Sequence, residues 1–468
     1  MIIRLGINTF IRVFTDYSYL ENQVTHQKMV FFNDEHYIIK QIGRFSKLLE
    51  NISNPRNDRH WLKSYLYYLS EFGMVVIGDN EDELSKKDLL FSYSRKKTIE
   101  DKINNLQNNH LFEKSGLWLK RIELEITPRC NERCIHCYIP IDEKINRNEI
   151  SLSMAKDIID QFCNMGGLSI ILSGGEPFLH KEIMKIVSYC REKDLMITIL
   201  SNLTNVTNKQ IEILKEERPF LIQTSLYSMD GRIHDRITLQ RGSYDKTRKN
   251  IEKCIENDIP LMISCPMTSI NMDSYVDVLN FSKKIGADFT SDYILLAQYD
   301  KNCANLKVRM TPNQIRQHLY QVVTNSTFYN NLIKSSKSEK DLLSKKYAIR
   351  KTCNVLQHDL CISSEGDVFA CPSWQDYSLG NLTNSSLFDI WTNSTRANTL
   401  RCVRRKDFQQ CNECDLTNFC EMCMVYNYNE NGGNYMNVSK RFCLTAQIFK
   451  EVIIDTYYKC LKGKNNHS

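Results

Sequence analysis

The fold is decided by the stretch "RIELEITPRCNERCIHCYIP", residues 121–140. Its first seven residues alternate polar and apolar side chains, which is the period of a β-strand. Cys130, Cys134 and Cys137 follow at once with the spacing C-x3-C-x2-C, and we call them the cysteine triplet. Three thiols placed this closely after a strand predict a metal or cluster site at the end of that strand.

Strand and helix patterns alternate on the C-terminal side of this stretch. The candidate strands are 121–127, 168–173, 195–200, 220–225, 261–265 and 289–295, and helical patterns lie between them. Thr207 with Gln210 predicts a capping box before one helix, and Gly286 predicts the end of another. Repeated strand-helix units predict a parallel sheet, open or curled into a full or partial barrel. Six units are too few for a complete eight-stranded barrel, so we expect a partial (β/α)6 barrel.

The segments outside this barrel differ in their patterns. Residues 1–85 group strand-like stretches (9–14, 27–32), helical patterns (35–52, 60–72) and a closing strand (73–79), which predicts a small α+β domain. The expected divisions are a domain at 1–85, a linker at 86–118, the barrel at 119–300, a helical spacer at 301–348 and a cysteine-rich region at 349–468. In such a barrel, ligands bind at the carboxyl ends of the strands, where the triplet lies.

Composition limits the classes of function. The chain has 468 residues and 18 cysteines, and its net charge of +6 arises from 61 basic and 55 acidic residues. This small excess of positive charge favours neither a nucleic-acid nor a membrane partner. Since no signal peptide and no long apolar run is found, we expect a soluble, cytoplasmic protein. Disulfides are rare in that reducing compartment, so clustered cysteines there more often bind metal or carry out redox chemistry.

The triplet is one thiolate short of a closed tetrahedral zinc or iron-sulfur site. An iron-sulfur cluster held by three cysteines keeps one iron open to a ligand that is not protein. A zinc ion completed by His136 is the alternative. The second candidate strand ends in "SGGEP", residues 173–177. Its two glycines let the backbone approach a ligand closely, and its glutamate supplies a fixed acceptor.

The triplet after the first strand and the GGE turn after the second together resemble the radical S-adenosylmethionine (radical SAM) enzymes. The resemblance implies that the triplet holds a [4Fe–4S] cluster whose fourth iron binds S-adenosylmethionine, which yields a 5′-deoxyadenosyl radical on one-electron reduction by an external flavodoxin or ferredoxin. The residues then expected to contact this cofactor are Gly174, Gly175, Glu176, Ser201, Asn202 and Ser225. The third strand ends in "SNLT", where the family more often has Asn-Gly after Thr, and single Ser or Asn residues at strand ends also serve as caps or turns.

Cysteines gather again near the C-terminus. Cys353, Gly366 and Cys371 have the spacing C-x12-G-x4-C, and residues 411–423 follow with C-x2-C-x5-C-x2-C before a distal Cys443. This pattern resembles the SPASM extension of peptide-modifying radical SAM enzymes. The resemblance implies two auxiliary [4Fe–4S] clusters, three in total, whereas the paired C-x2-C units alone would favour zinc knuckles. An outer set would comprise Cys411, Cys414, Cys420 and Cys443. An inner set would comprise Cys353, Cys371 and Cys423 and is one ligand short. Cys361, Cys303 or a substrate thiol would complete it.

The other cysteines fall mostly within helix or strand patterns, where small apolar core residues are the default interpretation. They are Cys163, Cys190, Cys254, Cys265, Cys402 and Cys460.

Residues 1–85 resemble the winged-helix domain that recognises leader peptides on enzymes maturing ribosomally made peptides. A leader would add as a strand to an exposed sheet edge. A DNA-binding winged helix or a stabilising cap are the alternatives.

The resemblance therefore predicts a radical SAM maturase that installs a cysteine sulfur-to-carbon thioether in a precursor peptide, as in the sactipeptide synthases, which "SLYSMDGRIHDRIT" after the fourth strand also resembles. Carbon-carbon cross-linking, epimerisation and sulfatase-type oxidation are alternative reactions. A metal-binding regulator without catalytic activity is the alternative class.

Overall fold

The computed structural model describes residues 1–90, 117–142, 147–344 and 356–465, and the statements below concern these ranges. No helix within them is long and apolar enough to cross a membrane. Most of the expected linker, the last residues of the expected spacer and Cys353 lie outside the described residues.

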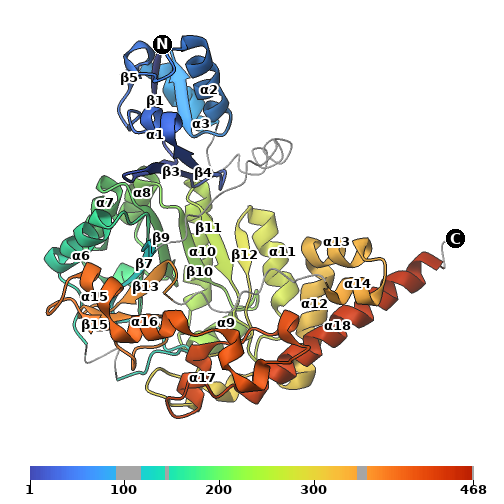
Figure 1. Cartoon of the computed structure of the whole chain (residues 1–468). Helices are drawn as coiled ribbons and strands as arrows, with labels where there is room; N and C mark the ends of the chain where they lie inside the picture. The colour runs from blue at the N-terminus through green and yellow to red at the C-terminus, as the bar shows by residue number, and fades with distance from the viewer. Residues whose placement is uncertain (91–116, 143–146, 345–355, 466–468) are drawn as a thin grey trace.

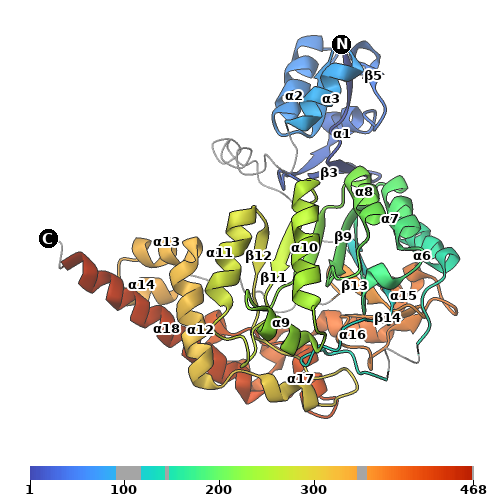
Figure 2. The same cartoon turned by 180° about the vertical axis from the view of Figure 1, so that it is seen from behind.

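The centre of the molecule is a nine-stranded sheet in the order β12-β11-β10-β9-β8-β7-β13-β14-β15. Six of its strands are parallel and follow the chain: β7 (Arg121–Thr127), β8 (Ser169–Gly174), β9 (Met196–Ser201), β10 (Leu221–Ser225), β11 (Leu261–Ser264) and β12 (Asp288–Thr290). The expected mixed α/β partial barrel is confirmed, and Figures 1 and 2 show it from two sides. The sixth strand is shorter than the expected 289–295, because pairing with β11 ends at Thr290.

Helices cover the outer face of the parallel strands. They are α6 (Leu152–Asn164), α7 (Ile183–Glu192), α8 (Asn208–Glu217), α10 (Ser243–Glu256) and α11 (Tyr275–Ile285), with the short α9 (Gly231–Thr238) after β10. The capping box of Thr207 and Gln210 is present at the start of α8. Gly286 ends α11 with a φ of 71°, a left-handed conformation that favours glycine.

The alternation within β7 places its side chains on two faces. Ile122, Leu124 and Ile126 are fully buried in the apolar core that the strands share with the helices. Glu123 and Glu125 point to the other face, the inside of the barrel, where Ser173 of β8 donates to Glu123. Glu123 and Glu125 therefore line the interior and not a solvent-exposed surface.

Residues 1–90 form a compact α+β unit with two antiparallel sheets, β5-β1-β6 and β2-β3-β4. Its elements are β1 (Ile2–Leu5), β2 (Thr9–Val13), β3 (Tyr17–Asn22), β4 (Lys28–Phe32), α1 (Asn33–Ile39), β5 (Lys47–Leu48), η1 (Leu49–Asn51), α2 (Arg59–Glu71), β6 (Val75–Gly78) and α3 (Glu81–Leu89). Figures 1 and 2 show it in blue at one end of the barrel strands, with α9 toward the other end.

One expected helix of this unit is wrong. The periodic stretch 35–52 forms the short helix α1 and the single 3-10 turn η1, because the chain leaves the α-helix after Ile39. It then returns as β5, whose Lys47 and Leu48 pair with Ile3 and Ile2 of β1. Tertiary strand pairing overrides the local helical pattern here.

The C-terminal region is joined to the barrel sheet itself. β13 (Asp359–Ile362) pairs in parallel with β7, and β14 (Asp367–Phe369) and β15 (Gly380–Asn381) continue antiparallel beside it. The remaining helices are η3 (Pro177–Leu179) after β8 and then, toward the C-terminus, η4 (Ala304–Val308), α12 (Pro312–Asn325), α13 (Thr327–Ser335), α14 (Glu339–Ser344), α15 (Leu387–Asn393), α16 (Thr395–Cys402), η5 (Arg405–Asp407), η6 (Gln409–Cys411), η7 (Thr417–Phe419), α17 (Met424–Glu430) and α18 (Lys440–Asn465).

The long helix α18 was not apparent from the sequence. It packs along α12, where Arg316 pairs with Glu451 at 2.5 Å and the Tyr320 hydroxyl donates to Asp455 at 2.6 Å. Its buried face includes Phe449, Val452 and Ile453.

Candidate cluster and cofactor site

The cysteine triplet lies on the loop that follows β7. Hydrogen bonds from the backbone nitrogens of Arg133 and Ile135 to the carbonyls of Thr238 and Ile237, both 3.0 Å, hold this loop against the end of α9. Each of the three cysteines is partly exposed, and no cysteine in the described ranges forms a disulfide. The loop therefore presents three thiols at the carboxyl edge of the sheet.

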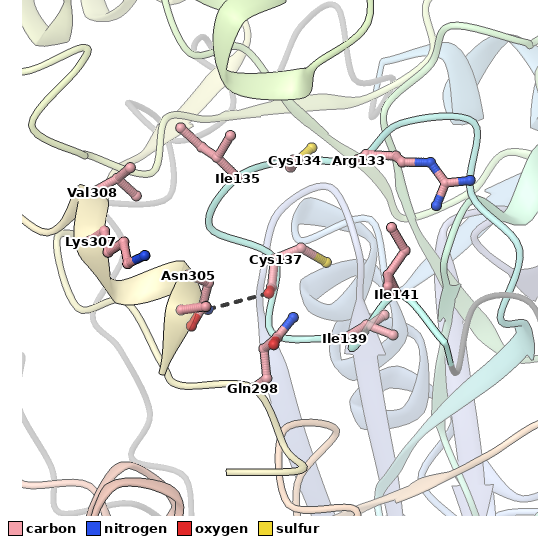
Figure 3. A pocket seen from close by; sticks show the side chains of 11 residues that line it. Arg133, Cys134, Ile135, Cys137, Ile139, Ile141, Gln298, Asn305, Lys307 and Val308 are labelled. Atoms are coloured by element: carbon pink, nitrogen blue, oxygen red, sulfur yellow. Dashed lines mark hydrogen bonds between the residues drawn. The ribbon is translucent and has the colours of Figure 1, made fainter. Parts of the chain in front are cut away.

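A cavity of about 400 Å³ opens beside two of these thiols. Figure 3 shows Cys134 and Cys137 on one wall and residues of η4 and the preceding loop on the other. Asn305 fixes the two walls together, because its side-chain nitrogen donates to the carbonyls of Cys137 at 3.3 Å and Leu296 at 2.9 Å. Cys130 does not line this cavity.

The glycine pair after β8 lies directly against the cysteine loop. A Cβ atom on Gly174 would lie 2.2 Å from the carbonyl oxygen of Thr127, and one on Gly175 would lie 2.2 Å from that of Arg129. The backbone nitrogens of Gly175 and Glu176 donate to these same two carbonyls, at 2.7 and 2.8 Å. The sequence predicted close approach to a ligand, and the structure shows close approach to the segment that leads into Cys130.

Glu176 joins the turn after β8 to the end of β9. Its carboxylate is 1% exposed and accepts hydrogen bonds from the Phe178 backbone nitrogen, the Ser201 hydroxyl and the Asn202 backbone nitrogen, at 2.8 to 3.0 Å. Burial raises the pKa of Glu176 to about 7, and these hydrogen bonds oppose that shift. In this structure the carboxylate is thus used to hold two loops together.

The predicted residues at the ends of β9 and β10 join the same edge. The Asn202 side chain donates to Asn131 of the cysteine loop at 3.1 Å, so three strand ends are linked through one network. Ser225 lies beside Tyr227, and burial raises the pKa of Tyr227 well above its ordinary value. The Tyr227 hydroxyl lies 3.9 Å from the Cys134 sulfur and 3.5 Å from Nε2 of His136.

Several functional candidates were missed by the sequence reasoning. Glu132 is 3% exposed and accepts a hydrogen bond from Ser243, whose hydroxyl also meets Nε2 of His234 at 3.2 Å. Burial lowers the pKa of His234 to about 4, so its ring is neutral. Tyr227 and His234 fall within the "SLYSMDGRIHDRIT" stretch, which was the available signal. Nothing in the sequence pattern singled out Ser243.

A second polar group lies inside the barrel, below the cysteine loop. Burial, and next the charge of Glu123, raise the pKa of Glu125 to about 8. Gln375 from the C-terminal region donates to both oxygens of Glu125 at 2.8 Å. Arg147 donates to the side-chain oxygen of Gln375 at 2.5 Å. The cysteine-rich region therefore contributes a side chain to the barrel interior.

The other three members of the outer cysteine set lie near enough to Cys411 for their charges to affect it. Burial raises the pKa of the Cys411 thiol, Arg405 opposes that shift, and the charges of neighbouring thiols add to it. Those neighbours are Cys420, Cys414 and Cys443. Cys443 comes from α18, so the set joins a loop of short 3-10 turns to the long helix. Thiols are the donors that an iron-sulfur cluster or a zinc ion takes, so the chemistry of this set fits either.

The inner set is described in part. Cys371 and Cys423 are partly exposed, and the remaining member, Cys353, lies outside the described residues. Cys361 is buried on β13 opposite Glu123, and burial raises its pKa well above the ordinary value, with Glu125, Glu123 and Cys371 adding to the shift. Of the two candidates for completing the set, Cys361 lies beside Cys371, while Cys303 is exposed and donates to the Lys301 carbonyl.

Within the described ranges, no three His, Cys, Asp or Glu side chains converge as ligands of one metal ion do. Ligands of a four-iron cluster bond to different iron atoms and lie farther apart than those of a zinc ion, at which Zn–S distances are about 2.3 Å. The donor chemistry of the triplet and of the outer set fits such clusters.

Comparison with known families assigns the class. Residues 124–282 match the radical SAM superfamily, and residues 353–415 match the SPASM iron-sulfur cluster-binding domain. The chain therefore carries a radical SAM domain followed by a SPASM domain. These two domains imply S-adenosylmethionine and [4Fe–4S] clusters as cofactors.

Similar proteins include two with different named activities. The subtilosin biosynthesis protein AlbA of Bacillus subtilis is 23% identical over 67% of this chain and 69% of its own length. An S-adenosylmethionine-dependent heme synthase of Methanosarcina barkeri is 22% identical over 66% of this chain and 93% of its own length. Among solved structures, SuiB of Streptococcus suis bound to the precursor peptide SuiA has a TM-score of 0.59 at 16% identity, and the match covers 90% of this chain and 96% of SuiB.

Proposed function

We propose that this chain is a maturase of a ribosomally made precursor peptide, and that it forms a thioether between a cysteine sulfur and a carbon of that peptide. The observation that carries the proposal is the likeness to peptide-bound SuiB over 90% of the chain. That coverage is more than the residues after 85 could supply, so the similarity in fold includes part of the N-terminal unit.

S-adenosylmethionine bound at a [4Fe–4S] cluster supplies, on one-electron reduction, a radical that takes hydrogen from a carbon. We assign the cysteine triplet to hold that cluster. Gly174, Gly175 and the residues bonded to Glu176 shape the adjacent edge of the sheet. Their shared network fixes the ends of β7, β8 and β9 relative to one another, which orients whatever binds there. A flavodoxin or ferredoxin is the proposed source of the electron.

The auxiliary cysteines suit the second half of a thioether reaction. Forming the carbon-sulfur bond removes a hydrogen atom from carbon, a proton from the thiol and one electron from the peptide. We assign the outer set to one auxiliary cluster. The inner set, with Cys371 and Cys423, would hold a group that takes up this electron, and its missing ligand leaves a place for the substrate thiol.

The N-terminal unit is the proposed binding domain for the leader of the precursor. β4 pairs with β3 on one side, and no described strand pairs with its other side. An extended leader adding there would gain backbone hydrogen bonds, and alternate side-chain pockets would give specificity.

The second candidate is chemistry on a tetrapyrrole. It is favoured by the heme synthase of Methanosarcina barkeri, which this chain matches over 93% of that protein's length. A tetrapyrrole substrate would have no use for a leader-binding unit, so removing residues 1–85 separates the two candidates. If the truncated enzyme no longer modifies a peptide but still cleaves S-adenosylmethionine, the result supports a peptide substrate.

Mass spectrometry of the precursor peptide encoded beside this gene, after anaerobic reaction and thiol alkylation, tests the proposal. We expect a loss of two hydrogens per bond and one cysteine protected from alkylation. Loss of two hydrogens with every cysteine alkylated would indicate a carbon-carbon bond. Unchanged mass with solvent deuterium at an α-carbon would indicate an epimerase. An oxidised residue without a cross-link would indicate sulfatase-type chemistry. If S-adenosylmethionine is not cleaved at all, the result would favour a metal-binding regulator without catalytic activity.

A further inference from the structure

The N-terminal unit packs on the amino edge of the barrel sheet. Phe10 and Tyr19 share an apolar cluster with Leu168 and Met196, and Trp118 and Phe220 pack against it. Leu168 directly precedes β8, Met196 begins β9, and Trp118 and Phe220 lie just before β7 and β10. All four barrel residues thus mark the start of a strand.

Partly buried cations fix the unit in this position. Arg12 donates to the carbonyls of Gly167 at 2.6 Å and Asp194 at 2.8 Å, and Arg44 pairs with the Asp194 carboxylate. From the barrel side, Arg191 donates to the carbonyl of Ile7 at 3.0 Å. The Arg12 side chain is 12% exposed, and this burial lowers its pKa. A domain held by directed, charge-assisted hydrogen bonds from several elements does not swing freely.

The cysteine triplet lies at the opposite edge of the same sheet. It follows the last residue of β7, and the glycine pair and Asn202 follow β8 and β9. Since β7 has seven residues, the two edges are separated by about 20 Å at roughly 3.3 Å per residue. A chain that passes outside the barrel must also cross a helical layer about 10 Å thick in each direction.

We infer that the substrate peptide carries a spacer between its leader and its first modified residue, and that this spacer has a minimum length set by the height of the barrel. The inference rests on the proposed function. A direct path of about 20 Å needs roughly six extended residues, and an outside path of about 40 Å needs roughly twelve. Modification should therefore fail below about six residues and reach its full rate near twelve.

The test is a series of precursor peptides with spacers from two to sixteen residues of Gly and Ser, given to the full-length reconstituted enzyme. Leader affinity, measured by fluorescence anisotropy of a labelled peptide, should stay constant along the series. The rate of modification, measured by mass spectrometry, should drop more than tenfold at the shortest spacers. Equal rates at every length would overturn the inference.

A second experiment weakens the contacts that hold the N-terminal unit on the barrel. Arg12→Ala combined with Arg44→Ala should let shorter spacers react, with leader affinity unchanged as the check that the unit is folded. Arg56→Ala is the matched control, because Arg56 pairs with Asp34 and lies over Trp61 inside the same unit, away from the barrel. An unchanged threshold in the folded double variant would count against the docked geometry. If no length is modified while S-adenosylmethionine is still cleaved, the peptide proposal itself fails, and the inference fails with it.

Discussion

Gly175→Ala should disable the cluster site without unfolding the barrel. The added Cβ would lie 2.2 Å from the carbonyl oxygen of Arg129 and 2.5 Å from that of Pro128, whereas ordinary contacts are 3.4 Å or longer. The segment before Cys130 must therefore move by about 1 Å, and a displacement of that size at a reacting site costs about 100-fold in rate. Weakening the hydrogen bonds to Thr127 and Arg129 costs about 1 kcal/mol each, and overpacking costs about 1 to 3 kcal/mol more.

The assay is iron content, 5′-deoxyadenosine formation under dithionite and urea unfolding of the same preparation. Gly43→Ala is the matched control, because nothing lies within 4 Å of its added Cβ. If Gly175→Ala keeps its full rate of 5′-deoxyadenosine formation, the two loops are not packed as described.

Three further outcomes are expected. Replacing the whole cysteine triplet by Ala should remove about four of about twelve irons and all S-adenosylmethionine cleavage, while the auxiliary absorption remains. Cys371→Ala and Cys423→Ala should each abolish the cross-link yet permit cofactor cleavage, as read by mass spectrometry and by 5′-deoxyadenosine; retention of the cross-link would remove the inner set from the reaction. Burial raises the pKa of Glu125 from 4.5 to about 8, so the folded state favours its protonated form. The contribution of Glu125 to stability is therefore full below about pH 4.5 and is lost as the pH rises to about 8. Glu125→Gln should flatten that part of the urea stability profile between pH 5 and 9, and an unchanged slope would contradict the assigned shift.

The barrel was predictable because its signals are local. The stretch 121–127 forms β7 over the same residues, and the capping box at Thr207 and the stop at Gly286 are found where the pattern placed them. The alternation of polar and apolar residues in β7 does not indicate which residues its polar face contacts. Glu123 and Glu125 point into the barrel, where Glu123 meets Ser173 and Glu125 meets Gln375, 250 residues further along the chain.

The parts that failed depend on distant partners. The pattern at 35–52 has the period of a helix, yet Lys47 and Leu48 form a strand because they pair with β1. α18 was missed because its apolar face is defined by packing on α12 more than by its own periodicity. The pairing of β13 with β7 was likewise invisible, since no local rule brings residue 359 beside residue 121.

The predicted site residues also divide into those placed by local motifs and those whose contacts depend on the fold. The triplet and the GGE turn are motifs of fixed spacing, so their nearness follows from two neighbouring strands. Ser201 and Asn202 were expected to contact the cofactor, whereas here they bind Glu176, and their proposed contact with the cofactor stays a prediction. Tyr227 was not selected, because only the folded loop brings its hydroxyl to Cys134.

The most direct measurement is the isotope content of 5′-deoxyadenosine formed when the reduced enzyme acts on a uniformly deuterated precursor peptide. We expect deuterium in 5′-deoxyadenosine in proportion to the cross-link formed, with none from the triplet-to-Ala variant. Formation of unlabelled 5′-deoxyadenosine at the rate seen without peptide would contradict a peptide as the hydrogen donor.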